Sequence, residues 1–180
     1  MTTMDDSMVE SRTVSSETLE QIRINDSEIN DLILWLDTFE ERPGLDALGE
    51  KLQSLDIDVD SLRESIQSAP DDYCRNILFR NENFELVVII WRPGQDTPIH
   101  DHVGSDCAFL ILDGESTETI YDLNSEGLAF PISSRIYSPG EVCAADEPDI
   151  HRVSNDADGE LINMHVYTPP LHAFNIYDSA

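Results

Sequence analysis

A series of short β-type segments, each closed by turn residues, runs from Phe84 to Pro169. The first, FELVVIIWRPG, has a β-branched centre and ends in a Pro-Gly turn. The next two, CAFLILDG and STETIYDL, surround an Asp-Gly pair, which favours a hairpin turn. SSRIYSPG, EVCAAD, DIHRVSN and LINMHVYTP follow at roughly ten-residue spacing. Short strands at this spacing predict a mainly β fold, an antiparallel β-barrel or jelly roll.

The first third of the chain has a helical pattern instead. Residues 26–41, DSEINDLILWLDTFEE, place apolar side chains at helical spacing, with Asp26 or Ser27 as the cap and RPG as the stop. LDALGEKLQSL and DVDSLRESIQS predict two more short helices, the last ended by Pro70. We expect one domain over residues 21–180, with N-terminal helices at about 26–70 and a β-barrel at about 73–171.

The charge balance excludes several classes of partner. The chain has 37 acidic against 10 basic residues, a net charge of -27 and a pI near 4.1. Such a field repels phosphate groups, so we expect no nucleic-acid and no membrane binding. Acid-rich, lysine-poor surfaces resemble those of proteins from salt-accumulating halophiles. Such surfaces are tolerated there because roughly 1 M salt reduces the Debye length to about 3 Å and so screens the self-repulsion. We therefore expect a cytoplasmic protein that works in a high-salt cytoplasm.

The N-terminus and the cysteines give further expectations. Residues 1–20, MTTMDDSMVESRTVSSETLE, lack the pattern of a signal peptide and predict a disordered acidic leader. No stretch of the sequence approaches a membrane span. Three cysteines fit neither a disulfide framework nor a CxxC zinc site, so we expect reduced thiols, with Cys74 and Cys143 buried.

Three histidines form a candidate metal site. His100 and His102 are two residues apart, and on a strand such side chains share one face while Asp101 points away. His151 lies in a later predicted strand that a closed barrel can bring beside them. A chance surface pair is the alternative, and for an isolated His-x-His it is as good an interpretation. For Asp101 and Asp106 a solvated face is expected, and the alternative is a role as hydrogen-bond acceptor beside the metal ligands.

The surroundings of the histidines resemble the two motifs of the cupin family. Matching positions are Gly94, His100, His102 and Gly114 in the first motif, and Pro139, Gly140, His151 and Asn155 in the second. Cys107 stands where cupins usually have a glutamate ligand. The remaining three neutral imidazoles would leave a divalent ion with open positions, which favours an anionic ligand such as a thiolate. With zinc such a site suits a hydrolase or hydratase; with iron(II) it can hold both a substrate and dioxygen.

From about Asp31 to Leu171 the chain resembles the cysteine dioxygenase family of cupin thiol dioxygenases. The segment YCRN matches a family motif and contains Tyr73 and Arg75. The resemblance implies that both bind the substrate and that Arg75 pairs with its carboxylate, for which the guanidinium fork is well suited. An ordinary surface ion pair is the alternative for Arg75 in so acidic a protein.

MHVYTPP matches the family signature His-x-Tyr followed by Ser/Thr-Pro-Pro. The resemblance implies that the Tyr167 hydroxyl lies beside the bound substrate and oxygen, with His165 hydrogen-bonded to it. In many members the tyrosine is joined to a cysteine by a thioether, which implies a Cys107–Tyr167 crosslink here. Asn163 replaces a serine that is common in the family, and its amide can still hydrogen-bond to the imidazole.

The resemblance implies an iron(II)-dependent enzyme with one Fe2+ per chain on His100, His102 and His151. It would add both atoms of O2 to the sulfur of L-cysteine and give cysteine sulfinic acid. The nearest alternative is a dioxygenase of 3-mercaptopropionate or of a broader range of thiols, although those enzymes typically carry glutamine in place of Arg75. An alternative of another class is a non-catalytic cupin that binds a metal or a small molecule. We expect a monomer.

Overall fold

The computed structural model describes residues 1–5, 11–68, 72–145 and 149–180. Its strands form a six-stranded sheet in the order β2-β3-β4-β10-β5-β8, a three-stranded sheet in the order β7-β6-β9, and a β1-β11 pair. The strands are β1 Thr2–Asp5, β2 Ser11–Thr13, β3 Cys74–Arg80, β4 Glu85–Trp91, β5 Asp106–Asp113, β6 Ser116–Leu123, β7 Ala129–Tyr137, β8 Val142–Ala145, β9 Ile150–Ser154, β10 Leu161–Thr168 and β11 Ala173–Ile176. The predicted mainly β fold is confirmed.

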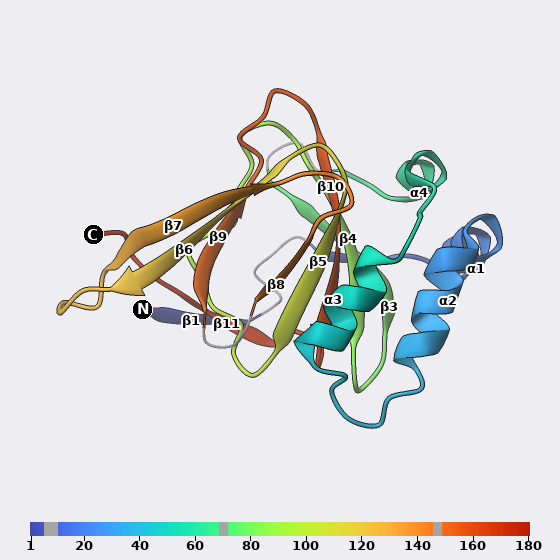
Figure 1. Ribbon diagram of the computed structural model, residues 1–180, viewed down its shortest axis with the longest axis horizontal. Coiled ribbons are helices and arrows are strands. Elements are labelled where there is room, and N and C mark those ends of the chain that lie inside the picture. The colour runs from blue at the N-terminus through green and yellow to red at the C-terminus, as the bar shows by residue number, and fades with distance from the viewer. Residues whose placement is uncertain (6–10, 69–71, 146–148) are drawn as a thin grey trace.

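Helices cover the outside of the six-stranded sheet, and the three-stranded sheet lies on the opposite side of the molecule (Figure 1). The helices are α1 Ser16–Asn25, α2 Ser27–Leu36, α3 Leu45–Gln53 and α4 Val59–Ser65. Helix α3 packs on β5 and β8, while α1 packs against α2 and α4. The predicted helical N-terminal region is therefore confirmed.

The central strands of the large sheet are buried on both faces because each face has its own apolar partner. In β4, Leu86, Val88 and Ile90 face the helices, whereas Val87, Ile89 and Trp91 point to the space between the sheets. Strands β5 and β10 alternate in the same way. This two-sided burial explains the continuous apolar run in FELVVIIW, since a strand with one solvated face would alternate with polar residues.

Asp26 is the residue that caps α2. Its Oδ1 accepts hydrogen bonds from the backbone amides of Glu28 at 2.9 Å and Ile29 at 3.3 Å. Its Oδ2 accepts from the Asp58 amide at 2.8 Å, which ties α2 to the start of α4. The helix ends at Leu36, earlier than predicted, because the amide of Thr38 bonds to the Trp35 carbonyl, three residues back.

A disordered leader was predicted for residues 1–20, but the described part of this segment is ordered. Strand β1 pairs antiparallel with β11, and β2 pairs parallel with β3. Helix α1 already begins at Ser16, which follows a cap at Ser15. Backbone pairing with edge strands supplies the order that the polar composition did not indicate. Residues 6–10, and Pro70 as the predicted end of the last helix, lie outside the described residues.

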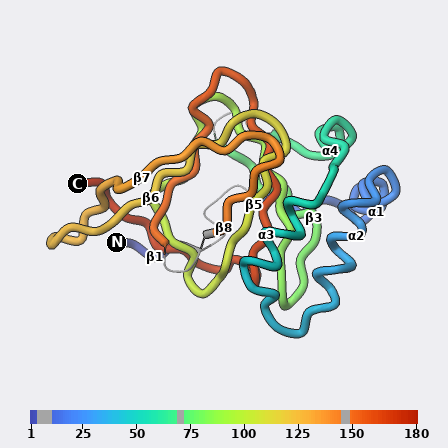
Figure 2. The backbone as a smooth tube through the Cα atoms, in the orientation of Figure 1, coloured from blue at the N-terminus to red at the C-terminus, as the bar shows by residue number. Residues whose placement is uncertain are grey.

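Both ends of the chain lie on the side of the three-stranded sheet (Figure 2). After β11, the Tyr177 amide donates to the Ile99 carbonyl and the Ala129 amide donates to the Asp178 carbonyl. The C-terminal segment thus holds the loop that carries the first two histidines. The sequence did not predict β11 or the early start of β7 at Ala129.

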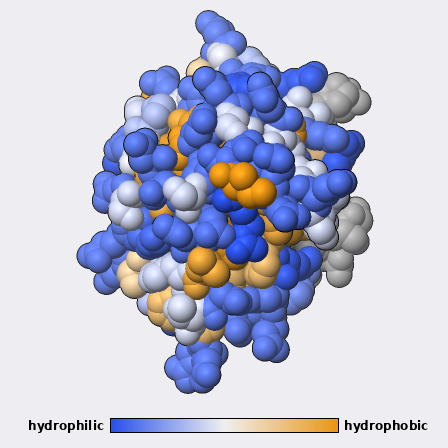
Figure 3. Space-filling view, turned by 90° about the vertical axis from the view of Figure 1, so that its right-hand side faces the viewer, coloured by the Kyte–Doolittle hydropathy of each residue, from blue (hydrophilic) through white to orange (hydrophobic). Residues whose placement is uncertain are grey.

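The face that carries the helices is mostly hydrophilic, with small separated hydrophobic groups (Figure 3). Exposed apolar side chains on the helices include Ile24 and Leu34. Among the described residues, no helix combines the length and the apolar character needed to cross a membrane.

Stability is expected to rise steeply with salt concentration. The net charge of -27 makes the folded chain repel itself, and salt near 1 M screens charges beyond about 3 Å. Thermal unfolding in low and in molar KCl measures the effect, with choline chloride as a control for ionic strength alone. A melting temperature that stays the same across this range contradicts the halophilic interpretation.

Candidate functional site

His100, His102 and His151 meet in the space between the two sheets. Their candidate ligand nitrogens all lie within 4.8 Å of one another, and all three side chains are buried. His151 lies on β9, whereas His100 and His102 lie in the loop between β4 and β5. His100 pairs with His151 by two backbone hydrogen bonds of 2.9 and 2.8 Å. An isolated β-bridge between His100 and His151 therefore brings the histidines together. His100 and His102 do not lie on the regular strand expected for His-x-His.

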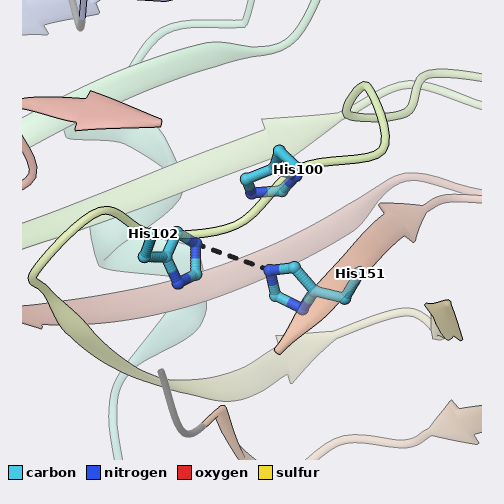
Figure 4. A group of neighbouring side chains, drawn as sticks. All are labelled: His100, His102 and His151. Atoms are coloured by element: carbon cyan, nitrogen blue, oxygen red, sulfur yellow. Dashed lines mark hydrogen bonds between the residues drawn. The ribbon is translucent and has the colours of Figure 1, made fainter. Parts of the chain in front are cut away.

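Hydrogen bonds fix the orientation of two of the three rings. The Nδ1 of His100 lies 2.9 Å from the Pro98 carbonyl, and the Nδ1 of His151 lies 2.7 Å from Glu118 Oε1. Both acceptors require a proton on Nδ1, which leaves Nε2 with a lone pair. The Nε2 atoms of His151 and His102 face each other at 3.4 Å (Figure 4). The Nε2 lone pair of His151 thus points at a nitrogen of a second buried imidazole, an arrangement that a shared proton or a bound metal ion would satisfy.

Burial keeps the rings of His100 and His102 in the neutral form that binds metals. It lowers the pKa of His100 to about 3, and the nearby His151 adds to the effect. The pKa of His102 is lowered well below its ordinary value for the same two reasons. Neutral nitrogens at neutral pH are therefore available as ligands.

The same burial makes the metal-free protein sensitive to acid. The pKa values of His100 and His165 fall from 6.5 to about 3 on burial, so as the pH falls the unfolded chain binds protons first. Their contribution to stability is complete above pH 6.5 and is lost down to about pH 3, at about 1.4 kcal/mol per pH unit for each histidine. Urea unfolding of metal-free wild type and His165→Gln across this window isolates one histidine from the carboxylates. Equal pH slopes for the two proteins contradict this expectation.

Arg75 lies on β3 and is buried, with 3% of its side chain exposed. Its Nη2 donates to Oε1 of Glu85 at 2.8 Å, and Glu85, on β4, is completely buried. A second guanidinium, that of Arg80, lies 3.5 Å from the other Glu85 oxygen. The surface ion pair considered as an alternative for Arg75 is therefore wrong, since the pair is internal. The sequence pattern gave no indication of Glu85.

Tyr167, His165 and Cys107 form a cluster on the inner face of the large sheet. Tyr167 and Cys107 are directly opposite each other on β10 and β5, which places their side chains on one face. His165 Nδ1 lies 3.5 Å from the Tyr167 hydroxyl and 3.8 Å from Cys107 Sγ. Burial raises the pKa of Tyr167 and of Cys107, so both keep their protons. The guanidinium of Arg75 lies 5.4 Å from the centre of the Tyr167 ring.

Asn163 does not bond to His165 in the part of the chain that the structure describes. Its Oδ1 accepts a hydrogen bond of 2.8 Å from the Trp91 indole. The Asn163 Nδ2 and the His165 Nε2 are both buried without a hydrogen-bond partner among the described residues. Asn163 therefore orients Trp91, and Trp91 in turn stacks on Tyr73 at 4.4 Å.

One cavity joins the predicted metal side to the predicted substrate side. Its lining includes the three clustered histidines together with Tyr73, Arg75, Cys107, His165 and Tyr167. Apolar side chains, among them Leu171 and Phe174, complete the wall. The cavity thus combines nitrogen ligands, one guanidinium and two phenols, which suits a small ligand with both a metal-binding and an anionic group.

Two carboxylates near the clustered histidines have surroundings that the sequence did not predict. Asp101 is 7% exposed and accepts hydrogen bonds from the Tyr177 hydroxyl at 2.6 Å and from Asn175 Nδ2 at 3.0 Å, so the solvated face expected for it is wrong. Glu118 was not predicted at all. Burial alone would raise its pKa, but hydrogen bonds from His151, Cys143 and Tyr137 outweigh burial and lower it. A charged residue at an inward position of a predicted strand was the only signal for it.

Comparison with known proteins gives matches of two kinds. Residues 25–180 match the model of a family described as cysteine dioxygenase type I. Cysteine dioxygenase type 1 from Danio rerio is 31% identical over 138 residues, covering 67% of this chain and 69% of the relative. The Homo sapiens protein of the same name is 28% identical over 139 residues, covering 67% and 68% of the two chains.

Solved structures match the fold at low identity. A Klebsiella pneumoniae protein with a double-stranded β-helix domain has a TM-score of 0.55 and 18% identity, covering 70% of this chain and 93% of that one. A Thermus thermophilus protein has a TM-score of 0.52 and 21% identity, covering 61% and 94%. These matches confirm the predicted jelly-roll fold.

Proposed function

Because the chain belongs to the cysteine dioxygenase type I family, we propose that it is an iron(II)-dependent enzyme that oxidises L-cysteine. The overall reaction adds both atoms of O2 to the thiol sulfur and gives cysteine sulfinic acid, with no other reactant. The observation that carries the proposal is the single cavity in which a buried three-histidine cluster and a buried arginine face the same space.

The three histidines fit iron(II). Imidazole nitrogen is a common ligand of Fe, Zn, Cu and Ni, so the donor type allows iron without selecting it. The oriented Nε2 atoms of His100 and His151, and that of His102, supply three nitrogen ligands. Iron bound there would supply open coordination positions and the redox chemistry that joins a thiol to O2. We assign His100, His102 and His151 as the ligands of one Fe2+ per chain.

Arg75 and Tyr73 are proposed to hold the carboxylate of the substrate. The guanidinium has five N–H donors, of which one on Nη2 bonds to Glu85 at 2.8 Å and one on Nη1 bonds to Ser11 Oγ at 3.3 Å. Glu85 fixes the plane of the guanidinium, so that other donors can face the cavity that Arg75 lines. A carboxylate in that cavity would have its charge balanced without exposure to water.

Tyr167 and His165 are proposed to act beside the reacting sulfur. Burial raises the pKa of the Tyr167 hydroxyl, so that it remains a hydrogen-bond donor. The hydroxyl can donate to the His165 Nδ1 in the resting site, or to oxygen atoms that build up negative charge on the substrate. His165, which burial keeps neutral, holds the phenol in place without adding charge.

An oxygen electrode tests the function and separates the alternatives. The protein, loaded with Fe2+ without air, is mixed with L-cysteine or with 3-mercaptopropionate, and the products are identified by mass spectrometry. We expect faster uptake with L-cysteine, because Arg75 stands where the mercaptopropionate enzymes typically carry glutamine. Faster uptake with 3-mercaptopropionate would indicate the alternative substrate. No oxygen uptake with either thiol would falsify the proposed activity and favour a non-catalytic cupin that binds a metal or a small molecule.

A thioether between Cys107 and Tyr167 is also proposed. The two residues are opposite each other across β5 and β10, and both side chains approach the Nδ1 of His165, at 3.8 Å and 3.5 Å. Joining sulfur to the ring removes one hydrogen from each residue, and O2 is the acceptor of both. After turnover, the intact mass should fall by two hydrogens in wild type but not in Cys107→Ala. Cys143→Ala is the matched control and should still lose them; an unchanged wild-type mass contradicts the crosslink.

A further inference from the structure

A buried carboxylate receives three hydrogen bonds behind one of the proposed iron ligands. Glu118, on β6, is 5% exposed. Its Oε1 lies 2.7 Å from His151 Nδ1, while its Oε2 accepts from Cys143 Sγ at 3.0 Å and from the Tyr137 hydroxyl at 3.2 Å. The donors come from β9, β8 and β7, so four strands converge on this side chain.

Burying the Glu118 carboxylate destabilises the fold unless other groups offset the loss of hydration. Removing an ionised carboxylate from water costs several kcal/mol, and a nearby cation usually offsets the cost. In the part of the chain that the structure describes, Glu118 has no arginine or lysine within ion-pair distance, and His151 is its closest charged or titratable partner. Neutral donors of the thiol and phenol type compensate the charge instead.

The two hydrogen-bonded ring nitrogens of the proposed ligands have different acceptors. His100 Nδ1 faces the neutral carbonyl of Pro98, whereas His151 Nδ1 faces a carboxylate. A carboxylate draws the Nδ1 proton more strongly than a carbonyl does, which increases the electron density at the opposite nitrogen. His151 should therefore be a stronger ligand than His100.

We propose that Glu118 is a positioning residue for the metal, acting through His151. It holds the ring with its proton on Nδ1 and its Nε2 toward His102, and its negative charge makes that Nε2 a stronger donor. Cys143 and Tyr137 hold the carboxylate in the orientation that this requires. The inference rests on the proposed metal site, but not on the identity of the substrate.

The test is metal affinity, which needs no turnover. Co2+ and Fe2+ binding are measured by competition with a coloured chelator, in wild type and in Glu118→Gln, which keeps the shape of the side chain and an oxygen acceptor but removes the charge. We expect a loss of affinity of about 10- to 100-fold, the range typical of such outer partners of metal ligands. The ligand-field bands of bound Co2+ should shift as well. Glu115→Gln, an exposed change of the same charge, is the matched control and should bind as wild type does.

Imidazole NMR of the metal-free protein gives a second readout. In wild type the His151 Nδ1–H should exchange slowly with water and resonate far downfield, and both signatures should weaken in Glu118→Gln. Tyr137→Phe, which removes one donor to the carboxylate, should change affinity in the same direction by a smaller factor, and it serves if Glu118→Gln does not fold. The proposal is overturned if a folded Glu118→Gln binds the metal as tightly as wild type does. If Glu118→Gln is unfolded, a wild-type affinity in Tyr137→Phe overturns it. Metal binding without cysteine oxidation would count against the proposed function alone.

Discussion

Replacing His102 with alanine is expected to abolish stoichiometric iron binding and to lower cysteine oxidation at least about 1,000-fold. Changes to residues that only support a metal ligand typically cost about 10- to 100-fold, so loss of a ligand itself should cost more. His102 Nε2 faces His151 Nε2 at 3.4 Å, and two remaining nitrogens cannot enclose an ion as three do. Iron content after anaerobic loading and oxygen uptake are the measurements.

His172→Ala is the matched control for that change. His172 follows the TPPL segment, is exposed and is not a member of the histidine cluster. It should keep full iron content and activity. Retention of one iron per chain and of normal oxygen uptake in His102→Ala would show that the three-histidine assignment is wrong.

Replacing Arg75 with leucine should affect stability and substrate binding together. It leaves the fully buried Glu85 without the guanidinium at 2.8 Å, and breaking a buried pair in this way typically costs about 3–5 kcal/mol. The same change removes the proposed partner of the substrate carboxylate, which should raise the KM for L-cysteine at least about 30-fold, or about 2 kcal/mol.

A double variant separates these two effects. Arg75→Leu/Glu85→Leu removes both charges, so it should recover most of the stability lost in Arg75→Leu, because an apolar pair can replace a buried ion pair. The KM for L-cysteine should stay high in the double variant. Urea unfolding and steady-state kinetics measure the two quantities. A double variant with a wild-type KM would rule out Arg75 as the partner of the carboxylate.

Local patterns predicted much of this fold. The helix at Ser27–Leu36 follows from apolar spacing and from the capping carboxylate of Asp26. The strand Glu85–Trp91 follows from its β-branched run between turn residues. Both signals are local, because spacing and caps act within a few residues. The strand pairing of the leader is not local, since β1 bonds to a strand more than one hundred and sixty residues later.

The same distinction applies to the site. The clustered histidines were found because the metal motif has a fixed spacing, although His100 and His102 lie in a loop and not in a regular strand. Glu85 and Glu118 were missed because their partners are defined by the register between strands. Nothing in the amino-acid sequence near Glu118 indicates that His151, on the neighbouring strand β9, contacts its carboxylate. For Asn163, the expected bond to His165 is absent among the described residues: the indole of Trp91, on β4, holds the Asn163 oxygen, and the Asn163 Nδ2 makes no hydrogen bond to the imidazole.

Isotope labelling tests the central claim most directly. Iron-loaded protein is mixed with L-cysteine under oxygen-18 gas in ordinary water, and the sulfur product is analysed by mass spectrometry. The proposed reaction predicts cysteine sulfinic acid in which both added oxygen atoms carry the label. Cystine as the main product, or a sulfinic acid with one or no labelled oxygen, would contradict a dioxygenase.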